Sequence, residues 1–336
     1  MTEKLKNKWL KLYEIANNIS KFEPCNYFFP TDRFTFITKG NKESYLFSFF
    51  RLTENINAVA CYLNEVDYMK AQKRLNTKNT KDEPTFFLQN ALVCIWDDRN
   101  HLSKESYKLI KELGFSFRGR GAWLHFDKYE TGYAPVTLNE KEVDILTEAL
   151  GNLFMMLRAI FEQNLDPKFD EGNTLVRWFE PETNLYYTNP FKIDLPTDIA
   201  QHPLVTLQET PRLIEVKNLT SKNYTVELDW SYIDVVCNDS NNRSAFPLLL
   251  LGVISETELI ITNDVLEPSN NNVYVVINAL DEVIELHGKP KQIKVSDEDL
   301  HNILFDFCKK TNIKLSLVSR LPALNKARKE SLSMMT

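Results

Sequence analysis

The stretch HGKPKQIKVSDEDL, residues 287–300, predicts the end of one helix, a short strand and the start of a second helix. Gly288 with Pro290 after it is typical of a helix end, and acidic residues before apolar positions are typical of a helix start. Asp297 therefore falls where a strand passes into a helix, a position at which many α/β proteins keep functional groups. Asp297 either takes part in chemistry or only caps the helix.

Strand and helix patterns alternate on both sides of this stretch. Three apolar strand patterns come before it, in YTVELDWSYIDVV, AFPLLLLGVIS and ETELIITNDVL, and the helix NVYVVINALDEVIELHG follows them. The helix DEDLHNILFDFCKKTN, the strand IKLSLVS and the helix LPALNKARKESL come after it. The predicted order is βββαβαβα, which indicates a mixed-sheet α/β domain over residues 213–336.

The segments ELDWSYIDVV, FPLLLLGVISETELI, HGKP, QIKVSDEDL and NIKLSLVSRLPALNKARKES together resemble the ribonuclease H-like fold, in particular the integrase and transposase core. In that family the first strand carries an Asp, the fourth strand ends at an Asp, and the last helix carries a Glu. The resemblance implies that the first and fourth strands lie side by side. It also implies Asp229, Asp297 and Glu330 as catalytic acids.

The chemistry that such acids serve is metal-dependent cleavage or transfer of a phosphodiester. Two Mg²⁺ ions about 4 Å apart, held by carboxylates from separate elements, activate a water and stabilise the leaving oxygen. The resemblance makes Asp229 and Asp297 the metal ligands, and the intervals between the three acids are near those of the family. A metal-dependent nuclease is therefore one hypothesis for this protein, and Mg²⁺ is the cofactor under that hypothesis alone.

Each acid also has a structural interpretation. Ser296 with Asp299 three residues later is a capping box, in which acids complement a helix N-terminus without catalysis. Asp229 alternates with Glu227 on a strand face that water could cover. Glu330 belongs to the charged segment KARKES, where a solvated glutamate is common. Acidic residues also outnumber basic ones in this domain, which is unfavourable for holding a polyanion. A degenerate, non-catalytic domain is the favoured hypothesis.

Residues 1–190 predict a separate α+β domain. An amphipathic helix fills the first twenty residues, and RFTFITK, SYLFSFFRL and INAVACYL predict three strands of an antiparallel sheet. The segments FFLQNALVCIW and SKESYKLIKELG predict a buried strand and a helix, and residues 139–165 predict a long helix with a capping box of Asn139 and Glu142. TLVRWFE and NLYYTNPF predict a hairpin. Four prolines, at 190, 196, 203 and 211, then indicate a linker over residues 191–212.

The segment FSFRGRGAWLHFDKYETGYAP is the most loop-like part of the first domain. Its glycines allow close backbone approach, guanidinium groups suit phosphate or carboxylate, and aromatic rings offer stacking faces. The expected ligand contacts come from the following residues: Arg118, Arg120, Trp123, His125 and Tyr133. The partner would be a protein or a small anionic ligand at the Arg118–Trp123 loop. In the alternative interpretation the arginines pair with nearby acids and the rings fill a loop core.

Four segments, WLKLYEIA, FRGRGAW, TGYAP and GKPKQI, span nearly the full chain. They resemble the W-x-x-L-Y-x-x-A, F-R-G-R-x-x-W, P-G-Y-x-P and G-x-P-x-x-I units of a family of bacterial two-domain proteins of unknown function. The sequence departs from that pattern at Thr131, which replaces a Pro, and at Leu124 and His125, which follow the Trp. The resemblance implies a bacterial source and no particular activity.

Composition narrows the class of protein. With 336 residues, 43% of them hydrophobic, the chain can bury more than one core. Its net charge of −6 provides no basic field for nucleic acid or an anionic membrane. Five widely spaced cysteines, without CxxC, are typical of a reducing compartment and argue against disulfides and zinc. Neither a signal peptide nor an apolar run of roughly 18 residues occurs. We therefore expect a cytoplasmic protein without a membrane segment.

Common catalytic motifs are missing from the sequence. No GxSxG, Walker A, GxGxxG or HExxH motif occurs, so the corresponding hydrolase, nucleotide-binding and metalloprotease classes gain no support. His101, His202 and His301 have no evident partner in the sequence, and none predicts a general base. Two hypotheses remain: a non-catalytic binding or regulatory protein, and the metal-dependent nuclease.

Overall fold

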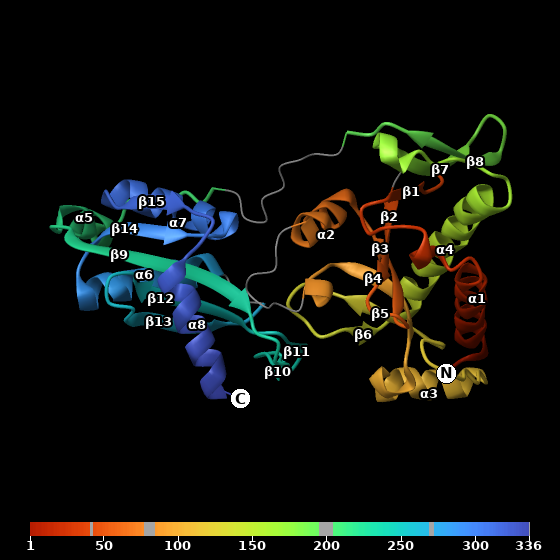
Figure 1. Ribbon diagram of the computed structural model, residues 1–336, viewed down its shortest axis with the longest axis horizontal. Helices are drawn as coiled ribbons and strands as arrows, with labels where there is room; N and C mark the ends of the chain where they lie inside the picture. The colour runs from red at the N-terminus through yellow and green to blue at the C-terminus, as the bar shows by residue number, and fades with distance from the viewer. Residues whose placement is uncertain (41–42, 77–84, 195–203, 269–271, 336) are drawn as a thin grey trace. The chain divides into compact units, whose positions relative to one another are not determined.

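The computed structural model describes residues 1–40, 43–76, 85–194, 204–268 and 272–335 (Figure 1). These residues form two compact units. The first domain consists of residues 1–76, 85–131 and 135–194, and the second of residues 132–134 and 204–335. The middle of the predicted linker lies outside the described residues. Its last two residues belong to α5 (Pro211–Asn218), a helix that the sequence did not predict.

The first domain is built on an eight-stranded sheet in the order β6-β5-β4-β3-β2-β1-β7-β8. Its strands are β1 (Arg33–Ile37), β2 (Ser44–Arg51), β3 (Asn57–Tyr62), β4 (Ala91–Asp97), β5 (Trp123–Tyr129), β6 (Val136–Thr137), β7 (Thr174–Glu180) and β8 (Leu185–Phe191). Its α-helices are α1 (Glu3–Ser20), α2 (Glu65–Asn76), α3 (Lys104–Leu113) and α4 (Glu140–Phe161). The 3-10 helices are η1 (Pro24–Asn26), η2 (Thr85–Phe87), η3 (Arg99–His101) and η4 (Phe169–Glu171).

The sheet is mixed rather than antiparallel as predicted. Neighbours from β1 to β6 pair antiparallel, but β1 and β7 pair parallel, with Phe34 opposite Leu175. Parallel pairing needs a long crossover connection, and here the chain between β6 and β7 contains the long helix α4. The predicted capping box does begin this helix: Asn139 accepts from the N–H of Glu142, and Glu142 accepts from the N–H of Asn139.

Helices cover both faces of the central strands. On one face α1 and α4 pack against the sheet through a core that includes Leu12, Phe126 and Leu153 (Figure 1). On the other face a smaller core includes Tyr62, Tyr68 and the ring of Tyr129, with Tyr68 contributed by α2. Strands β2, β3 and β4 are therefore almost continuously apolar, because both of their faces are buried.

The segment predicted as a loop contains the regular strand β5. Seven residues pair antiparallel with β4, so Ile95 lies opposite His125 and Val93 lies opposite Asp127. Only the preceding residues, through Ala122, and those from Glu130 to Pro135 lie outside extended strands. The glycines at 119 and 121 suggested a longer loop than the chain forms, whereas polar and apolar residues alternate from Leu124 to Asp127 with the period of a strand.

The second domain is built on a five-stranded sheet in the order β13-β12-β9-β14-β15. Its main strands are β9 (Lys222–Tyr232), β12 (Leu248–Ile254), β13 (Ile260–Leu266), β14 (Pro290–Val295) and β15 (Lys314–Leu317). Its helices after α5 are α6 (Asn272–His287), α7 (Glu298–Thr311) and α8 (Pro322–Met335). A small antiparallel pair, β10 (Cys237–Asn238) and β11 (Ser244–Ala245), interrupts the series and was not predicted.

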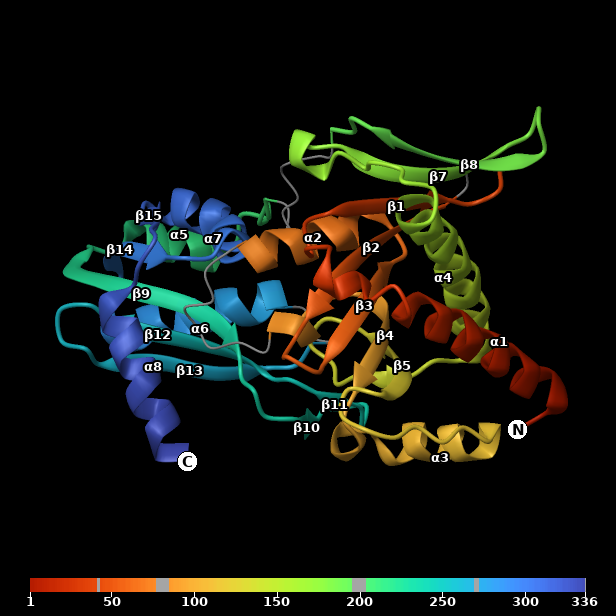
Figure 2. The same ribbon diagram turned by 45° about the vertical axis from the view of Figure 1, so that its right-hand side comes forward.

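The predicted neighbourhood of the first and fourth strands is confirmed. Strand β9 pairs parallel with β14, and β14 pairs parallel with β15, whereas β12 is antiparallel to β9 and β13 (Figure 2). Helices α5, α6 and α7 share one core on one face of this sheet. Helix α8 packs on the other face, where Leu324 contacts the side chains of Leu251 and Val253. Within the described residues, every helix of the protein is too short or too polar to cross a membrane.

The turn before β5 yields a test of how this strand is held. Gly121 has φ of +61°, and a Cβ there would lie 2.0 Å from the carbonyl oxygen of Asn55, whereas a Cβ at Gly119 would meet open space. Both glycines have positive φ, so Ala strains the backbone at either position by about 1 kcal/mol, and only Gly121→Ala adds a clash with backbone. We expect Gly121→Ala to destabilise the protein clearly more than Gly119→Ala in urea denaturation. Equal losses would contradict the close approach to Asn55.

Candidate functional site

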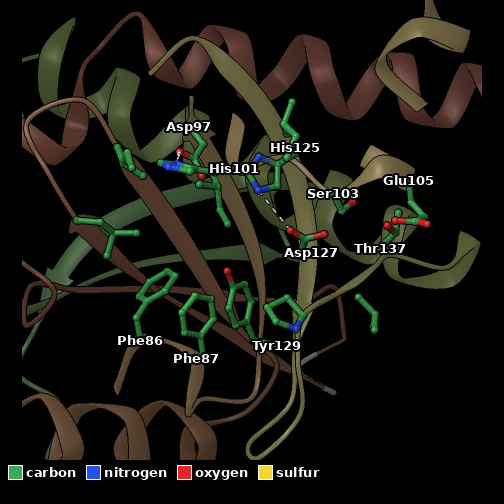
Figure 3. Close-up of a pocket in the computed structure, with 16 residues that line it drawn as sticks. Phe86, Phe87, Asp97, His101, Ser103, Glu105, His125, Asp127, Tyr129 and Thr137 are labelled. Atoms are coloured by element: carbon green, nitrogen blue, oxygen red, sulfur yellow. Dashed lines mark hydrogen bonds and ion pairs between the residues drawn. The ribbon is translucent and has the colours of Figure 1, made fainter. Parts of the chain in front are cut away.

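A cavity of about 740 Å³ opens beside β4 and β5 in the first domain (Figure 3). This volume lies within the roughly 300–1,000 Å³ that small-molecule sites occupy. The described residues that line it come from β4, β5, β6, the turns η2 and η3, the start of α3, the β2–β3 connection and the segment before β6: Leu52, Ile56, Phe86, Phe87, Ile95, Asp97, His101, Leu102, Ser103, Glu105, His125, Asp127, Tyr129, Pro135, Val136 and Thr137.

Strand alternation puts three functional groups of β5 on the cavity side. Leu124 and Phe126 belong to the core beneath α1 and α4, so the intervening residues point to the opposite face. These are His125, Asp127 and Tyr129, and all three line the cavity. The short strand β6 completes this side, because Thr137 pairs directly opposite Asp127.

Two histidine–aspartate pairs lie in the cavity wall (Figure 3). Nδ1 of His101 lies 2.8 Å from Oδ1 of Asp97, which also accepts the backbone N–H of Asp98 at 2.6 Å. Nε2 of His125 lies 3.3 Å from Oδ2 of Asp127. We expected no partner for His101, and that expectation is wrong, because a 3-10 turn after β4 brings its ring back to the last residue of the strand.

Three aromatic rings form the opposite wall. Phe87 stacks on Tyr129 with ring centroids 5.7 Å apart, and Phe86 meets both rings edge to face. Figure 3 shows these rings across the cavity from the histidines, with the hydroxyl of Tyr129 directed into the space between them. Burial raises the pKa of this hydroxyl well above its ordinary value, and the nearby carboxylates of Asp127 and Asp97 raise it further. Tyr129 therefore stays protonated and able to donate.

Asp127 carries the perturbed carboxyl group of the cavity. Burial raises its pKa above the ordinary value, and the neighbouring His125 opposes that rise. Desolvation penalises the ionised form of a carboxylate unless donors replace the lost water. A ligand that donates hydrogen bonds to Asp127 would relieve this penalty.

The structure separates the five residues that the sequence proposed as a ligand surface. His125 lines the cavity, whereas Trp123 is buried against Tyr107 and Phe117. Arg118 and Arg120 are exposed on the turn that precedes β5 and do not line the cavity. Tyr133 belongs to the second domain, where its backbone bridges Ala245 and its ring lies 3.6 Å from the guanidinium of Arg243.

Sequence reasoning missed most of the cavity. Asp97, His101 and Asp127 were not proposed, although the alternation of polar and apolar residues from 124 to 127 could have identified Asp127 as a neighbour of His125 on one strand face. The rings of η2 carry no such signal, because a turn positions them and not a periodic element.

In the second domain, Asp229 is buried on β9 beneath α8. Its side chain is almost inaccessible, and Oδ2 accepts from the hydroxyl of Ser296 at 2.9 Å and lies 3.4 Å from the guanidinium of Arg328. Glu227, two residues earlier, is buried on the same face and accepts from Ser255 and from the N–H of Leu324 at the start of α8. The strand face that we expected water to cover is therefore covered by a helix, and its two acids hold that helix.

Asp297 is the cap of α7. Its carboxylate accepts the N–H of Leu300 at 3.0 Å, and its backbone has the extended conformation of an N-cap residue. The predicted capping box with Ser296 as the cap is wrong by one residue, since the Ser296 hydroxyl turns to Asp229 instead. Glu330 is exposed on α8, two residues after the buried Arg328. In the described parts of the chain, no three or more His, Cys, Asp or Glu side chains are grouped so that they could hold a metal ion.

The fold defines a two-domain α+β protein, and comparison with known families agrees with that division. Residues 9–177 match a family described as a domain of unknown function, DUF7309, and residues 212–331 match a second domain of unknown function, DUF6930. The chain belongs to the DUF7309 family. A search of curated proteins found no match. The expected family of two-domain proteins of unknown function is thus confirmed.

The raised pKa of Asp127 predicts a pH-dependent effect of its removal. A carboxyl whose pKa is raised by folding resists ionisation, so it costs stability above its ordinary pKa of 3.8 and costs nothing well below that value. We expect Asp127→Asn to raise the melting temperature at about pH 7, with the gain disappearing toward about pH 3. Glu112→Gln, an exposed acid on α3, is the control. A loss of stability at neutral pH would contradict the burial penalty.

Breaking the buried pair beneath α8 is predicted to be costly. Asp229→Ala leaves the guanidinium of Arg328 buried without its carboxylate, which typically costs about 3–5 kcal/mol. Lys326→Ala on the same helix removes an exposed pair with Glu258 and is expected to cost less than about 1 kcal/mol. Urea denaturation of the two variants measures the difference. Similar losses in both would show that the pair does not hold α8.

Proposed function

We propose that this protein is a non-catalytic binding protein that takes a small molecule into the cavity of its first domain. The observation that carries the proposal is the cavity itself, where convergent polar groups face an aromatic wall. Small-molecule sites combine these features: an apolar lining that removes ligand surface from water and a few polar groups that fix its orientation.

Strand pairing and ring-to-ring contacts position the walls of the cavity. Five of the lining residues lie on strands β4 and β5, which pair over seven residues. Tyr129 is fixed by its contacts with Phe86 and Phe87, and Phe86 also packs on Phe50. Preorganised side chains lose little conformational entropy when a ligand binds. The proposal places the ligand here and not at the Arg118–Trp123 loop, because Trp123 is buried in the core.

For the second domain we propose a ribonuclease H-like origin without catalysis. Strand order supports the ancestry: three consecutive strands form an antiparallel meander, and the fourth and fifth strands add in parallel beside the first. The contacts of Asp229 and Asp297 support the absence of nuclease activity. Asp229 is occupied by Ser296 and Arg328, while Asp297 caps α7.

A Mg²⁺ ion fits these residues poorly. The metal prefers carboxylate oxygens and water in an octahedron, and the guanidinium of Arg328 already supplies positive charge to Asp229 from within the buried layer. The nuclease alternative therefore gains no support from the donor set, and we derive no reaction from it. The second domain instead supplies a rigid sheet, one face of which is closed by α8.

Binding in the cavity is tested with indole, a neutral aromatic probe small enough for the space. Saturation-transfer NMR on the full chain is expected to show transfer to indole. Thr137→Trp, which places a large ring opposite Asp127, is expected to weaken binding by about tenfold or more, equivalent to about 1.4 kcal/mol. The matched control is Lys108→Trp, because Lys108 is highly exposed on α3 and does not line the cavity.

A second variant that fills the cavity keeps the test valid if Thr137→Trp does not fold. Leu52→Trp fills the cavity from the β2–β3 side at a partly exposed position that tolerates a large side chain. Circular dichroism establishes that each variant is folded. If indole binds folded Thr137→Trp and Leu52→Trp as well as it binds the parent chain, the proposed function is wrong.

A further inference from the structure

Asp127 is a half-buried carboxylate with few hydrogen-bond partners in the protein. Its side chain is 14% exposed, and among the described residues its one polar contact is Nε2 of His125 at 3.3 Å. An ionised carboxylate can accept about four hydrogen bonds, and in water it does so. The cavity therefore contains a carboxylate whose acceptor capacity is directed at whatever fills the space.

His125 is also incompletely bonded. The residue is 5% exposed, and its Nδ1 has no hydrogen-bond partner, whereas Nε2 faces Asp127. Nδ1 itself is almost inaccessible, so Asp127 is the residue of this pair that offers acceptors to a ligand in the cavity. A ligand that complements them must supply N–H or O–H groups.

The charge of the lining selects among such ligands. Among the described residues that line the cavity, Asp97, Glu105 and Asp127 are acidic and none is Lys or Arg. Among the described lining residues only the imidazoles of His101 and His125 can carry positive charge, and each already faces an aspartate, so an anion in this space would meet carboxylates at a cost in free energy. A cation would gain from the same groups. The field of the cavity therefore favours a positively charged ligand.

The aromatic wall can contact the apolar part of such a cation. Phe87 and Tyr129 present stacked rings, and Phe86 lies edge to face against them. Ring faces attract an ammonium group within about 6 Å and bury the apolar part of an amine equally well. Figure 3 shows the rings and the carboxylates on facing sides of one space, so a single molecule can contact both.

We propose that the cavity binds a small organic cation, an amine with an apolar or aromatic body. Its ammonium group donates hydrogen bonds to Asp127, with Asp97 adding negative charge nearby, and its body lies against Phe87 and Tyr129. This inference rests on the proposed function, because it names the chemical class of the ligand for the same site. The number of acceptors favours a primary amine over a quaternary ammonium group, which has no N–H to donate.

Three probes of similar size and different charge test the class of ligand. They are 2-phenylethylamine, a cation at neutral pH, 2-phenylethanol, which is neutral, and 3-phenylpropanoate, an anion. Binding to the full chain is measured by saturation-transfer titration at low ionic strength, where charge effects are largest. The amine is expected to bind about tenfold more tightly than the alcohol or better, since a charge-assisted hydrogen bond is worth roughly twice a neutral one. The anion is expected to bind more weakly than the alcohol.

Variants assign the preference to Asp127. Asp127→Asn keeps the shape of the side chain and removes its charge, so the preference for the amine over the alcohol is expected to fall to within about threefold. Glu112→Gln makes the same change on the exposed surface of α3, outside the cavity, and is expected to leave the preference intact. Phe87→Leu is expected to weaken the amine and the alcohol alike, because both probes use the aromatic wall.

The outcomes separate the two proposals. Equal binding of amine and alcohol to the parent chain, or an amine preference that survives in Asp127→Asn, overturns the cation assignment and leaves a neutral-ligand cavity standing. Failure of all three probes and of indole overturns the proposed function itself.

Discussion

The candidate site depends on one constraint, the alternation of side chains along β5. Leu124 and Phe126 must point into the core beneath α1 and α4, and burial of two such side chains supplies roughly 1.5–3 kcal/mol each. Because the period of a strand is two, this fixes His125 and Asp127 on the other face. A slip of one residue would bury a histidine and a carboxylate among leucines and phenylalanines. The apolar core thus sets the direction of the polar groups, and their imperfect bonding follows from the position they must take.

The second domain also has acidic side chains on one strand face, but there they have partners within the domain. Its first strand also carries acids at alternate positions, Glu227 and Asp229, but here a helix covers them and supplies partners. The N-terminus of α8 donates to Glu227 and Arg328 faces Asp229. Ser255, Leu324, Ser296 and Arg328 all belong to the second domain, so their contacts with these two acids stabilise its structure. In the first domain Asp127 has His125 beside it and lines the cavity, the arrangement on which the proposed binding role rests.

The sequence predicted the second domain better than the first. Periodic apolar patterns identified the eight main elements of the second domain, and the adjacency of β9 and β14 followed from the family resemblance. Prediction from the sequence failed for residues whose positions depend on tertiary contacts. Glycines at 119 and 121 suggested a loop through Trp123, yet pairing with β4 makes this segment a strand. The burial of Asp229 depends on which face of the sheet α8 packs against, and the pairing of His101 with Asp97 depends on a turn of three residues. Neither contact can be predicted from one segment of the sequence alone.

Histidine chemical shifts provide the most direct measurement of the central claim, that β5 directs His125 and Asp127 into a ligand cavity. Long-range proton–nitrogen correlation spectra report the tautomer and environment of each imidazole ring. On titration with 2-phenylethylamine, the account predicts that the nitrogen resonances of His125 and His101 shift with one common saturation curve, while those of His287 and His301 in the second domain do not. Unchanged His125 resonances at a probe concentration that saturates the protein would contradict the account.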